Sequence, residues 1–566
     1  MKTRSRRALG LLLAVLLPAL ALSGCGLSAQ TLDELLYGQT EEPRLSPEPV
    51  EYIIPLAQGD WLDEVYRPDV DYADMADIAA QAELGPKLER LLEFCRGGED
   101  WELSEAYLEA ADELGLVYTR YSLADIAYCA GPTEETEAAL DSARQAWQQA
   151  LLDFYNVMGE LALSNAQLLD EALGEGVAEN FAGYAGMESW GGDAGAQEQL
   201  LYSYHQLMQS PQPDEQAAAE LFVQLVELRN AEAREAGWSS YAEQCYYEDY
   251  YRAYSPQDAA SVVWPAVKEY CAPLLGLYEE AAADALWTLY YESGLDCSEE
   301  RVLEVLDYVA PRLSRDAAEA LDYMLAHGLY DIGPSPTKLD TGFTAYLYYF
   351  NVPFLFNSPY GDVDDFSDSF HEFGHYLNGY GTVSDLVFGM PDMDLSELQA
   401  QGMEIMFTHW YEDVFGGYAD EMLLATLWDM LDSVVEGSLY DEFQQRCYAE
   451  PDLTAERACE LYLETAAGYG LEPGKYDWLY IPHNFDDPFY YISYCLSALP
   501  ALELYGILQE EPETAATLYM RAVSLDPELY YFDEALEECG FSDVFDAESY
   551  AACARQLEPE FERLSS

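Results

Sequence analysis

The stretch SFHEFGHYLNGYG, Ser369 to Gly381, contains two of the six histidines of a 566-residue chain, four residues apart and with a glutamate directly after the first. Aspartates precede the stretch and suit a helix N-terminus, and we expect the helix to end near Gly379. On such a helix His371 and His375 share one face and can reach a single metal ion. Glu372 then lies beside the ion, where it can act as a general base. The alternative is a buried helix face on which both histidines are satisfied by hydrogen bonds.

A third metal ligand has to come from elsewhere in the chain, because a catalytic zinc site has three protein ligands and one open position. The residues after His375 read Tyr-Leu-Asn-Gly and offer no further histidine at a suitable spacing. The next candidate is Glu397 in MPDMDLSELQAQGMEIMF, on a second predicted helix that starts near Asp394. Asp394 and Glu397 also match a capping box, in which the glutamate serves the start of the helix. From the residues alone, both interpretations of Glu397 stay open.

Most of the remaining chain has a helical pattern. From about Tyr52 onward, segments such as DEQAAAELFVQLVELRNAEAREAG place apolar residues three and four positions apart on strong helix formers. The exception is Thr344 to Pro359, TAYLYYFNVPFLFNSP, where aromatic and β-branched residues are bounded by Pro and Gly. This composition predicts strands or a hairpin directly before the histidine helix.

The charge of the chain excludes one class of partner. Lys and Arg number 25 against 106 Asp and Glu, which gives a formal net charge of −81. Such a chain repels phosphate backbones, so we expect no nucleic-acid partner. Half of the residues are hydrophobic, and the acids are spread among them, as on the solvated surface of a folded protein.

The N-terminus has the pattern of an export signal. MKTRSRR is basic, LGLLLAVLLPALAL is apolar, and LSGC follows, ending at Cys25. LSGC resembles the lipobox of bacterial lipoproteins, which predicts a signal peptide over 1–24, a lipidated Cys25 and a polar tether over 25–50. The protein is then held at the cell membrane, outside the cytoplasm. The alternative is an ordinary cleaved signal with an accidental cysteine.

Ten further cysteines lie between Cys95 and Cys553, without a CxxC pair. Export permits disulfides, but their pairing cannot be deduced from this spacing. We interpret these residues as buried free thiols.

The site segments together carry a family resemblance. HEFGH, the glutamate helix after it and GFTAYLYYFNVPFLFNSPYGDVDDFSDSF before it are similar to the M3 family of zinc oligopeptidases, particularly its oligoendopeptidase F branch. The segments Leu225 to Gln244 and Trp478 to Leu499 and the C-terminal tail share the resemblance, which covers the chain from about Leu221 to its end.

The resemblance implies a mostly α-helical, two-lobed metallopeptidase with a deep substrate cleft and a small β-sheet near the active-site helix. It implies an N-terminal helical region over 51–205 and a catalytic region over 206–566. One Zn²⁺ per chain would be bound by His371, His375 and Glu397, with Glu372 as general base.

Further roles follow from the same resemblance. His483, Tyr490, Tyr491 and Tyr494 would donate hydrogen bonds to the substrate and to the oxyanion, with Tyr494 and His483 favoured. The strand PFLFNSP, Pro353 to Pro359, would provide the edge along which a peptide binds. Glu404 could orient a histidine ligand or could equally be an exposed helix residue.

The function implied is that of a zinc-dependent metalloendopeptidase that hydrolyses oligopeptides and is anchored outside the cytoplasmic membrane. The alternative is a catalytically inactive lipoprotein that binds peptides with the same fold.

Overall fold

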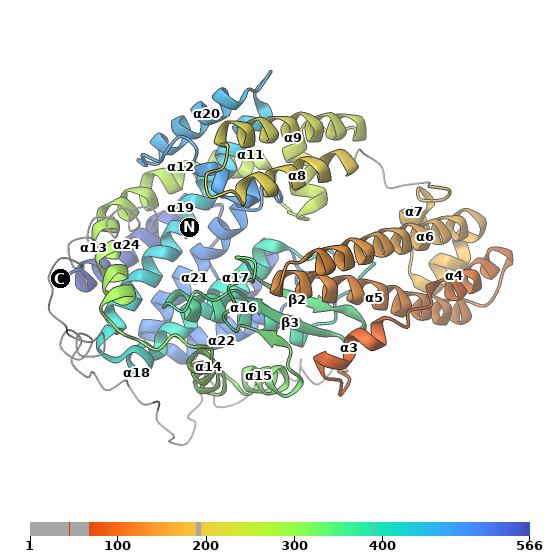
Figure 1. The fold of residues 1–566 in the computed structure, drawn as a ribbon, viewed down its shortest axis with the longest axis horizontal. Helices are drawn as coiled ribbons and strands as arrows, with labels where there is room; N and C mark the ends of the chain where they lie inside the picture. The colour runs from red at the N-terminus through yellow and green to blue at the C-terminus, as the bar shows by residue number, and fades with distance from the viewer. Residues whose placement is uncertain (1–44, 46–66, 188–193, 388) are drawn as a thin grey trace.

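The computed structural model describes residues 45, 67–187, 194–387 and 389–566. The predicted signal peptide and Cys25 lie outside these ranges, as does the predicted tether apart from Leu45. Figure 1 shows helices packed around one small sheet, which confirms the predicted mostly helical fold. Within the described ranges, every helix is too short or too polar to cross a membrane.

Four helices near the start of the described chain share a hydrophobic core of their own. They are α4 (Leu84–Glu93), α5 (Asp100–Ala130), α6 (Glu134–Leu173) and α7 (Val177–Ala182), whereas α3 (Tyr72–Ala79) before them packs into the larger core. α5 and α6 lie side by side, and the core contains side chains from α4, α5, α6 and α7 (Figure 1). The Tyr155 hydroxyl donates to the carbonyl oxygen of Val387 at 3.0 Å and joins this group to the loop between the two predicted site helices. The boundary between 51–205 and 206–566 stays a prediction.

The middle of the chain adds helices that lead into the sheet. They are α8 (Ala194–Met208), α9 (Glu215–Ala236), α10 (Tyr241–Gln244), α11 (Pro256–Asp258), α12 (Trp264–Ala266), α13 (Ala272–Tyr291), α14 (Glu299–Leu313) and α15 (Arg315–His327). Ser314 caps α15 by accepting from the backbone N–H of Ala317. Gly328 ends α15 in the left-handed conformation, φ 66°, and turns the chain into the first strand.

The small sheet corrects the predicted substrate edge. Its strands are β1 (Tyr330–Asp331), β2 (Gly342–Leu347) and β3 (Val352–Asn357), in the order β1-β3-β2. β2 and β3 form the predicted hairpin, in which Thr344 lies opposite Leu355. β1 pairs in parallel with the other side of β3, so β3 is the central strand and is buried throughout. The prediction that Pro353 to Pro359 forms an open edge is therefore wrong, and the edge belongs to β2.

The remaining helices complete the larger core, and α16 joins them to the sheet. They are α16 (Asp364–Gly381), α17 (Met393–Phe407), α18 (Tyr411–Phe415), α19 (Ala419–Ala449), α20 (Ala455–Gly468), α21 (Ile492–Glu510), α22 (Pro512–Val523), α23 (Phe532–Cys539) and α24 (Ala547–Leu564). α16 packs against β3 and α17, and α21 packs against α17 and α19. The ring of Phe370 stacks on that of Phe407 at 3.8 Å and fixes α16 to the end of α17. Three segments far apart in sequence therefore meet at one place.

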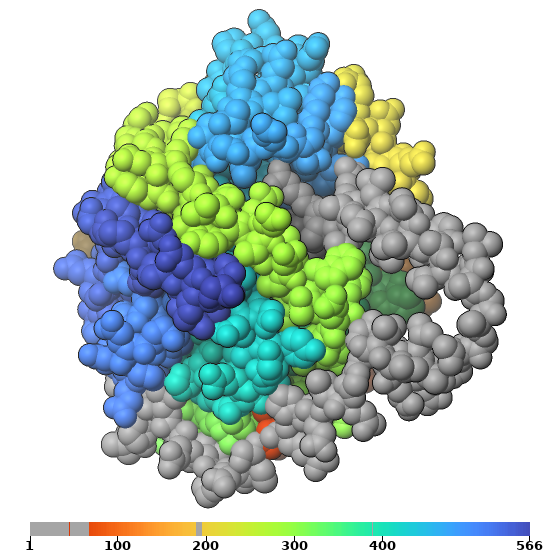
Figure 2. Space-filling model, turned by 90° about the vertical axis from the view of Figure 1, so that its left-hand side faces the viewer, coloured from red at the N-terminus to blue at the C-terminus, as the bar shows by residue number. Residues whose placement is uncertain are grey.

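One face of the molecule is covered by helices from different parts of the chain. Figure 2 shows α24, in dark blue, beside the green α13, with the blue α20 above them. α13 and α24 both contact α19, which they cover from this side. The side of α19 that contacts α21 faces the interior instead.

The cysteines match their interpretation as thiols. All ten cysteines within the described residues are free, and all but Cys95 and Cys297 are fully buried. The fold in these ranges is therefore held by packing and hydrogen bonds.

Candidate metal centre

The two histidines of α16 lie one turn apart and point to the same side. Their ring centroids are 5.0 Å apart. The helix extends beyond the predicted end, and Gly379 lies inside it. Pro353 of β3 packs against Gly379, where a Cβ would lie 3.4 Å from the proline side chain. Gly374, between the histidines, has a tighter constraint, because a Cβ there would lie 2.7 Å from the Cα of Ala400. The backbone of α16 therefore touches that of α17 directly.

α17 brings Glu397 to the histidines. The N-cap of this helix is Asp392, whose side chain accepts from the backbone N–H of Leu395 at 3.0 Å. The capping-box interpretation of Asp394 and Glu397 is therefore wrong. The Glu397 Oε2 instead lies 3.4 Å from Nε2 of His371.

The three side chains are close enough to hold one metal ion. One ligand atom from each of His371, His375 and Glu397 lies within 4.8 Å of the other two, and this is the one such cluster in the described part of the chain. Glu397 is 3% exposed, and its Oε2 is buried without a hydrogen bond. An unpaired buried carboxylate oxygen is costly, and a cation beside it removes the cost. Two imidazoles and one carboxylate are a ligand set found in catalytic zinc sites.

Glu372 is buried beside this cluster. Its Oε2 accepts a hydrogen bond from the Thr344 hydroxyl of β2 at 2.9 Å, and the same hydroxyl reaches the Glu372 carbonyl oxygen at 3.0 Å. Burial raises the pKa of Glu372 to about 7. A carboxyl group with such a pKa can both accept and release a proton near neutrality. Thr344 was not identified from the sequence, since only the register of β2 on β3 shows that it meets Glu372.

Glu404 is one of the side chains that hold the histidines. Its Oε1 lies 2.7 Å from Nδ1 of His371. This contact leaves Nε2 of the ring to face Glu397. The exposed-residue interpretation of Glu404 is therefore wrong.

The two histidines differ in their electrostatic surroundings. Burial lowers the pKa of His371, but the nearby carboxylates of Glu397 and Glu404 outweigh burial and hold this pKa well above its ordinary value. Burial lowers the pKa of His375 to about 4, so its ring is neutral at pH 7. A positive charge on or between these rings is thus stabilised by the two carboxylates.

His483, Tyr490, Tyr491 and Tyr494, here called the aromatic group, face the cluster from the start of α21. The Tyr490 hydroxyl donates to Oε1 of Glu397. The His483 ring lies 5.1 Å from Tyr491 and 6.1 Å from Tyr494, and its Nδ1 is buried without a partner. Burial raises the pKa of Tyr494 well above its ordinary value, and the charges of Glu397 and Glu372 add to this shift. Its phenol therefore stays protonated and lies near both carboxylates.

A buried arginine fixes the aromatic group relative to α17. Arg252 donates to the carbonyl oxygen of Phe489 at 3.0 Å and to the Ser493 hydroxyl at 2.8 Å. Its Nε lies 3.4 Å from Oδ1 of Asp394, in the first turn of α17. Phe489 has a φ of 67°, which is rare for a residue with a side chain. Arg252 therefore holds a strained turn, and no local sequence pattern indicates this contact.

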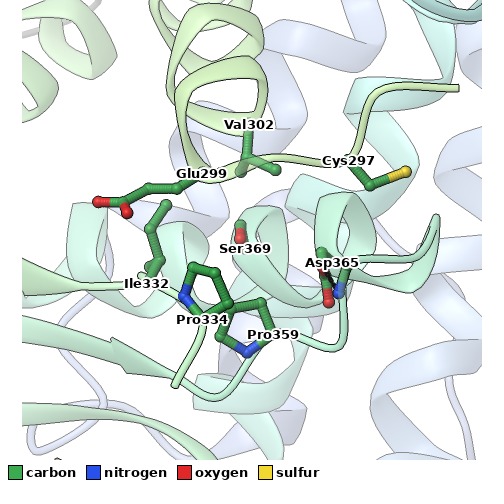
Figure 3. A pocket seen from close by; sticks show the side chains of 9 residues that line it. Cys297, Glu299, Val302, Ile332, Pro334, Pro359, Asp365 and Ser369 are labelled. Atoms are coloured by element: carbon green, nitrogen blue, oxygen red, sulfur yellow. Dashed lines mark hydrogen bonds between the residues drawn. The ribbon is translucent and has the colours of Figure 1, made fainter. Parts of the chain in front are cut away.

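A small pocket lies on the other side of α16. Figure 3 shows Asp365 and Ser369 of this helix beside Pro334 and Pro359. Ser369 is about 200° around the helix from His371, so the pocket does not open onto the metal centre. The Asp365 carboxylate accepts from the backbone N–H groups of two residues before the helix, Tyr360 and Gly361. These two hydrogen bonds stabilise the start of α16.

Only the comparison with solved structures finds proteins similar to this chain, and it shows the fold. No family model matches the chain, and no curated protein does. PZ peptidase A with an inhibitor is similar over 89% of this chain and 100% of its own, with 17% identity and a TM-score of 0.68. A structure provisionally named oligoendopeptidase F, from Bacillus anthracis str. Ames, is similar over 88% of this chain and 97% of its own, with 16% identity and a TM-score of 0.65.

Oligoendopeptidase-F from Enterococcus faecium is similar over 87% of this chain and 98% of its own, with 16% identity and a TM-score of 0.50. The fold is thus that of the helical oligopeptidases. Within that class it is the oligoendopeptidase F-like fold of the M3 peptidases, as the sequence resemblance implies.

Proposed function

We propose that this protein is a zinc-dependent metalloendopeptidase that hydrolyses oligopeptides. The observation that carries the proposal is the cluster of His371, His375 and Glu397, with Glu372 buried at its side and Oε2 of Glu397 unpaired. A binding protein would have no use for a buried base held by its own hydrogen-bond donor. The oligoendopeptidase F-like fold supports the same function.

The chain's own groups fit this reaction. A zinc ion bound to the cluster would polarise the scissile carbonyl and acidify water. Glu372 takes the proton of the attacking water and returns it to the leaving amine. Thr344 fixes one oxygen of Glu372, which leaves the other for the proton. Tyr494 and His483 donate to the carbonyl oxygen as it gains negative charge.

The edge strand β2 suits a peptide substrate. A peptide that pairs with β2 would extend the sheet by one strand, since β3 is already paired on both sides. Gly342, at the start of β2, has no side chain, and a Cβ there would lie 3.4 Å from Oε1 of Glu372. The bare backbone at this position lets a peptide bond approach the base.

Peptide cleavage tests the proposal. The protein should bind about one zinc ion per chain and cleave a quenched peptide library, lose activity in a strong chelator and regain it when zinc returns. Zinc binding without cleavage of any peptide would contradict the enzymatic function and favour a peptide-binding protein.

The lipid anchor is a separate part of the proposal. LSGC before and at Cys25 supports lipidation, which would hold the protein outside the cytoplasmic membrane. In a bacterial host, Cys25→Ser should move the protein from the membrane fraction to the soluble fraction and abolish incorporation of labelled fatty acid. An unchanged distribution would contradict the anchor.

A further inference from the structure

Three carboxylates, here called the acidic row, follow one face of α19 towards the aromatic group. Asp429, Asp432 and Glu436 stand three and four residues apart and so lie on the same side of the helix. At Gly437 the helix comes so close to α21 that a Cβ would lie 2.4 Å from the carbonyl oxygen of Tyr491. Glu436 directly precedes this crossing. Its charge acts on Tyr491, whose pKa is raised first by burial and next by Glu436.

Glu436 lacks a partner of its own. It is 9% exposed, and its Oε2 is buried without a hydrogen bond. Leaving such an oxygen unpaired is costly, so it indicates a place where a ligand provides the donor. The ring of Tyr491 lies 5.1 Å from that of His483. Glu436 therefore lies close in the fold to the aromatic group, two members of which the proposed function assigns to the substrate.

Asp429, at the other end of the acidic row, interacts electrostatically with Glu404. Burial raises the pKa of Asp429 well above its ordinary value. Among the nearby charged groups, the carboxylate of Glu404 contributes most to this increase in pKa. Glu404 in turn contacts His371. Like charges this close destabilise one another, and a cation placed among them relieves the repulsion.

A metal ion does not fit the acidic row. Among the described residues, only His371, His375 and Glu397 bring three ligand atoms close enough to hold one ion. The carboxylates of the row are spread along two turns of α19 instead. An elongated cation matches this spacing, and a protein substrate offers one in its arginine and lysine side chains.

We propose that the acidic row is a subsite for a positively charged side chain of the peptide, with Glu436 as its main contact. This inference rests on the function proposed above. Arginine suits the subsite best, because its guanidinium group pairs with carboxylates through two N–H donors and stacks on tyrosine rings such as that of Tyr491. These three acids of a strongly acidic chain would then contribute to substrate selection.

Peptide binding tests the subsite without turnover. The zinc-loaded Glu372→Gln variant is titrated with fluorescent peptides that differ only in carrying Arg, Lys or Gln at one position, with that position moved along the peptide. At one position the Arg peptide should bind at least about tenfold more tightly than the Gln peptide. Adding Glu436→Gln should reduce this ratio towards one, whereas Glu421→Gln, in the first turn of the same helix, should leave it unchanged.

A salt titration provides a second test that needs no further variant. The Arg to Gln ratio should fall as ionic strength rises, because salt screens the charge pair. Equal binding of Arg and Gln peptides at every position, or a ratio that Glu436→Gln does not change in a folded protein, would overturn the subsite. If the unaltered protein cleaves no peptide, the enzymatic proposal fails, while the binding ratios still decide whether the subsite exists.

Discussion

The Tyr490 hydroxyl donates to Oε1 of Glu397, while Oε2 of the same carboxylate is buried and unpaired. The carboxylate is thereby oriented so that one oxygen is left for a metal ion. The hydroxyl that the family resemblance assigned to the substrate is thus already engaged with a ligand.

Tyr490→Phe should therefore weaken zinc binding about 10- to 100-fold, as the loss of a group that orients a ligand usually does. Competition with a chromogenic chelator measures the affinity. Tyr491→Phe is the matched control, because Tyr491 is the next residue and has no hydrogen bond to Glu397. Normal zinc affinity with a lowered kcat would show that Tyr490 acts on the substrate.

Glu372→Gln should keep the zinc and lose activity. The amide preserves the size of the side chain and cannot accept the proton, so kcat should fall by about 10²–10⁴-fold or more. Zinc content and peptide hydrolysis are measured on the same sample. Near-normal turnover would contradict the role of Glu372 as the base.

The two acids at the start of α17 should behave differently. Glu397→Ala should release zinc at chelator concentrations that the unaltered protein withstands. Asp392→Ala removes the helix cap and should lower the free energy of unfolding by about 0.5–2 kcal/mol while zinc stays bound. Chelator titration and urea unfolding of both variants separate the two roles, and zinc retention in Glu397→Ala would remove Glu397 from the ligand set.

Tyr494→Phe should lower kcat far more than it raises KM. Its hydroxyl is needed when negative charge develops on the carbonyl oxygen, and one such donor is worth about 10²–10³ in rate. Steady-state kinetics on one fluorogenic peptide measure both constants, and a thermal melt checks folding. If kcat stays within a few-fold, His483 becomes the first alternative donor.

Arg252→Met should destabilise the protein strongly. The change leaves the Asp394 charge buried without its cation, and breaking such a pair costs about 3–5 kcal/mol. Urea unfolding measures the loss. Arg457→Gln is the control, because Arg457 pairs with glutamates at the surface and its removal should change stability little.

The elements that depend on local pattern were predictable. The histidine helix and the hairpin before it follow from residue spacing and strand composition within short windows. The end of α16 was misplaced, because the reason for Gly379 is the contact with Pro353, which no local pattern shows. The position of the sheet edge was wrong for a similar reason, since β1 lies before the predicted hairpin in sequence and pairs with β3 from outside it.

The roles of the acids required the structure. A capping box and a metal ligand can have the same spacing, and only the position of Asp392 as the N-cap decides between them for Glu397. Arg252 lies more than a hundred residues before Asp394, so its contact depends entirely on tertiary packing. Glu436 is one of many acids in the sequence and is distinguished only by its burial.

Gly374 touches no substrate and binds no ion, yet it sets how closely the two ligand-bearing helices approach. Any larger residue would push against the backbone of α17 at Ala400, one turn after Glu397. Metal–ligand distances tolerate only about ±0.2 Å, so even a shift of about half an ångström would leave the carboxylate short of the ion. A combinatorial library that fixed the chemically active side chains and randomised their neighbours should therefore return glycine here as strictly as it returns the ligands. The proposed metal centre therefore depends on the absence of a methyl group at position 374 as well as on the side chains that bind the ion.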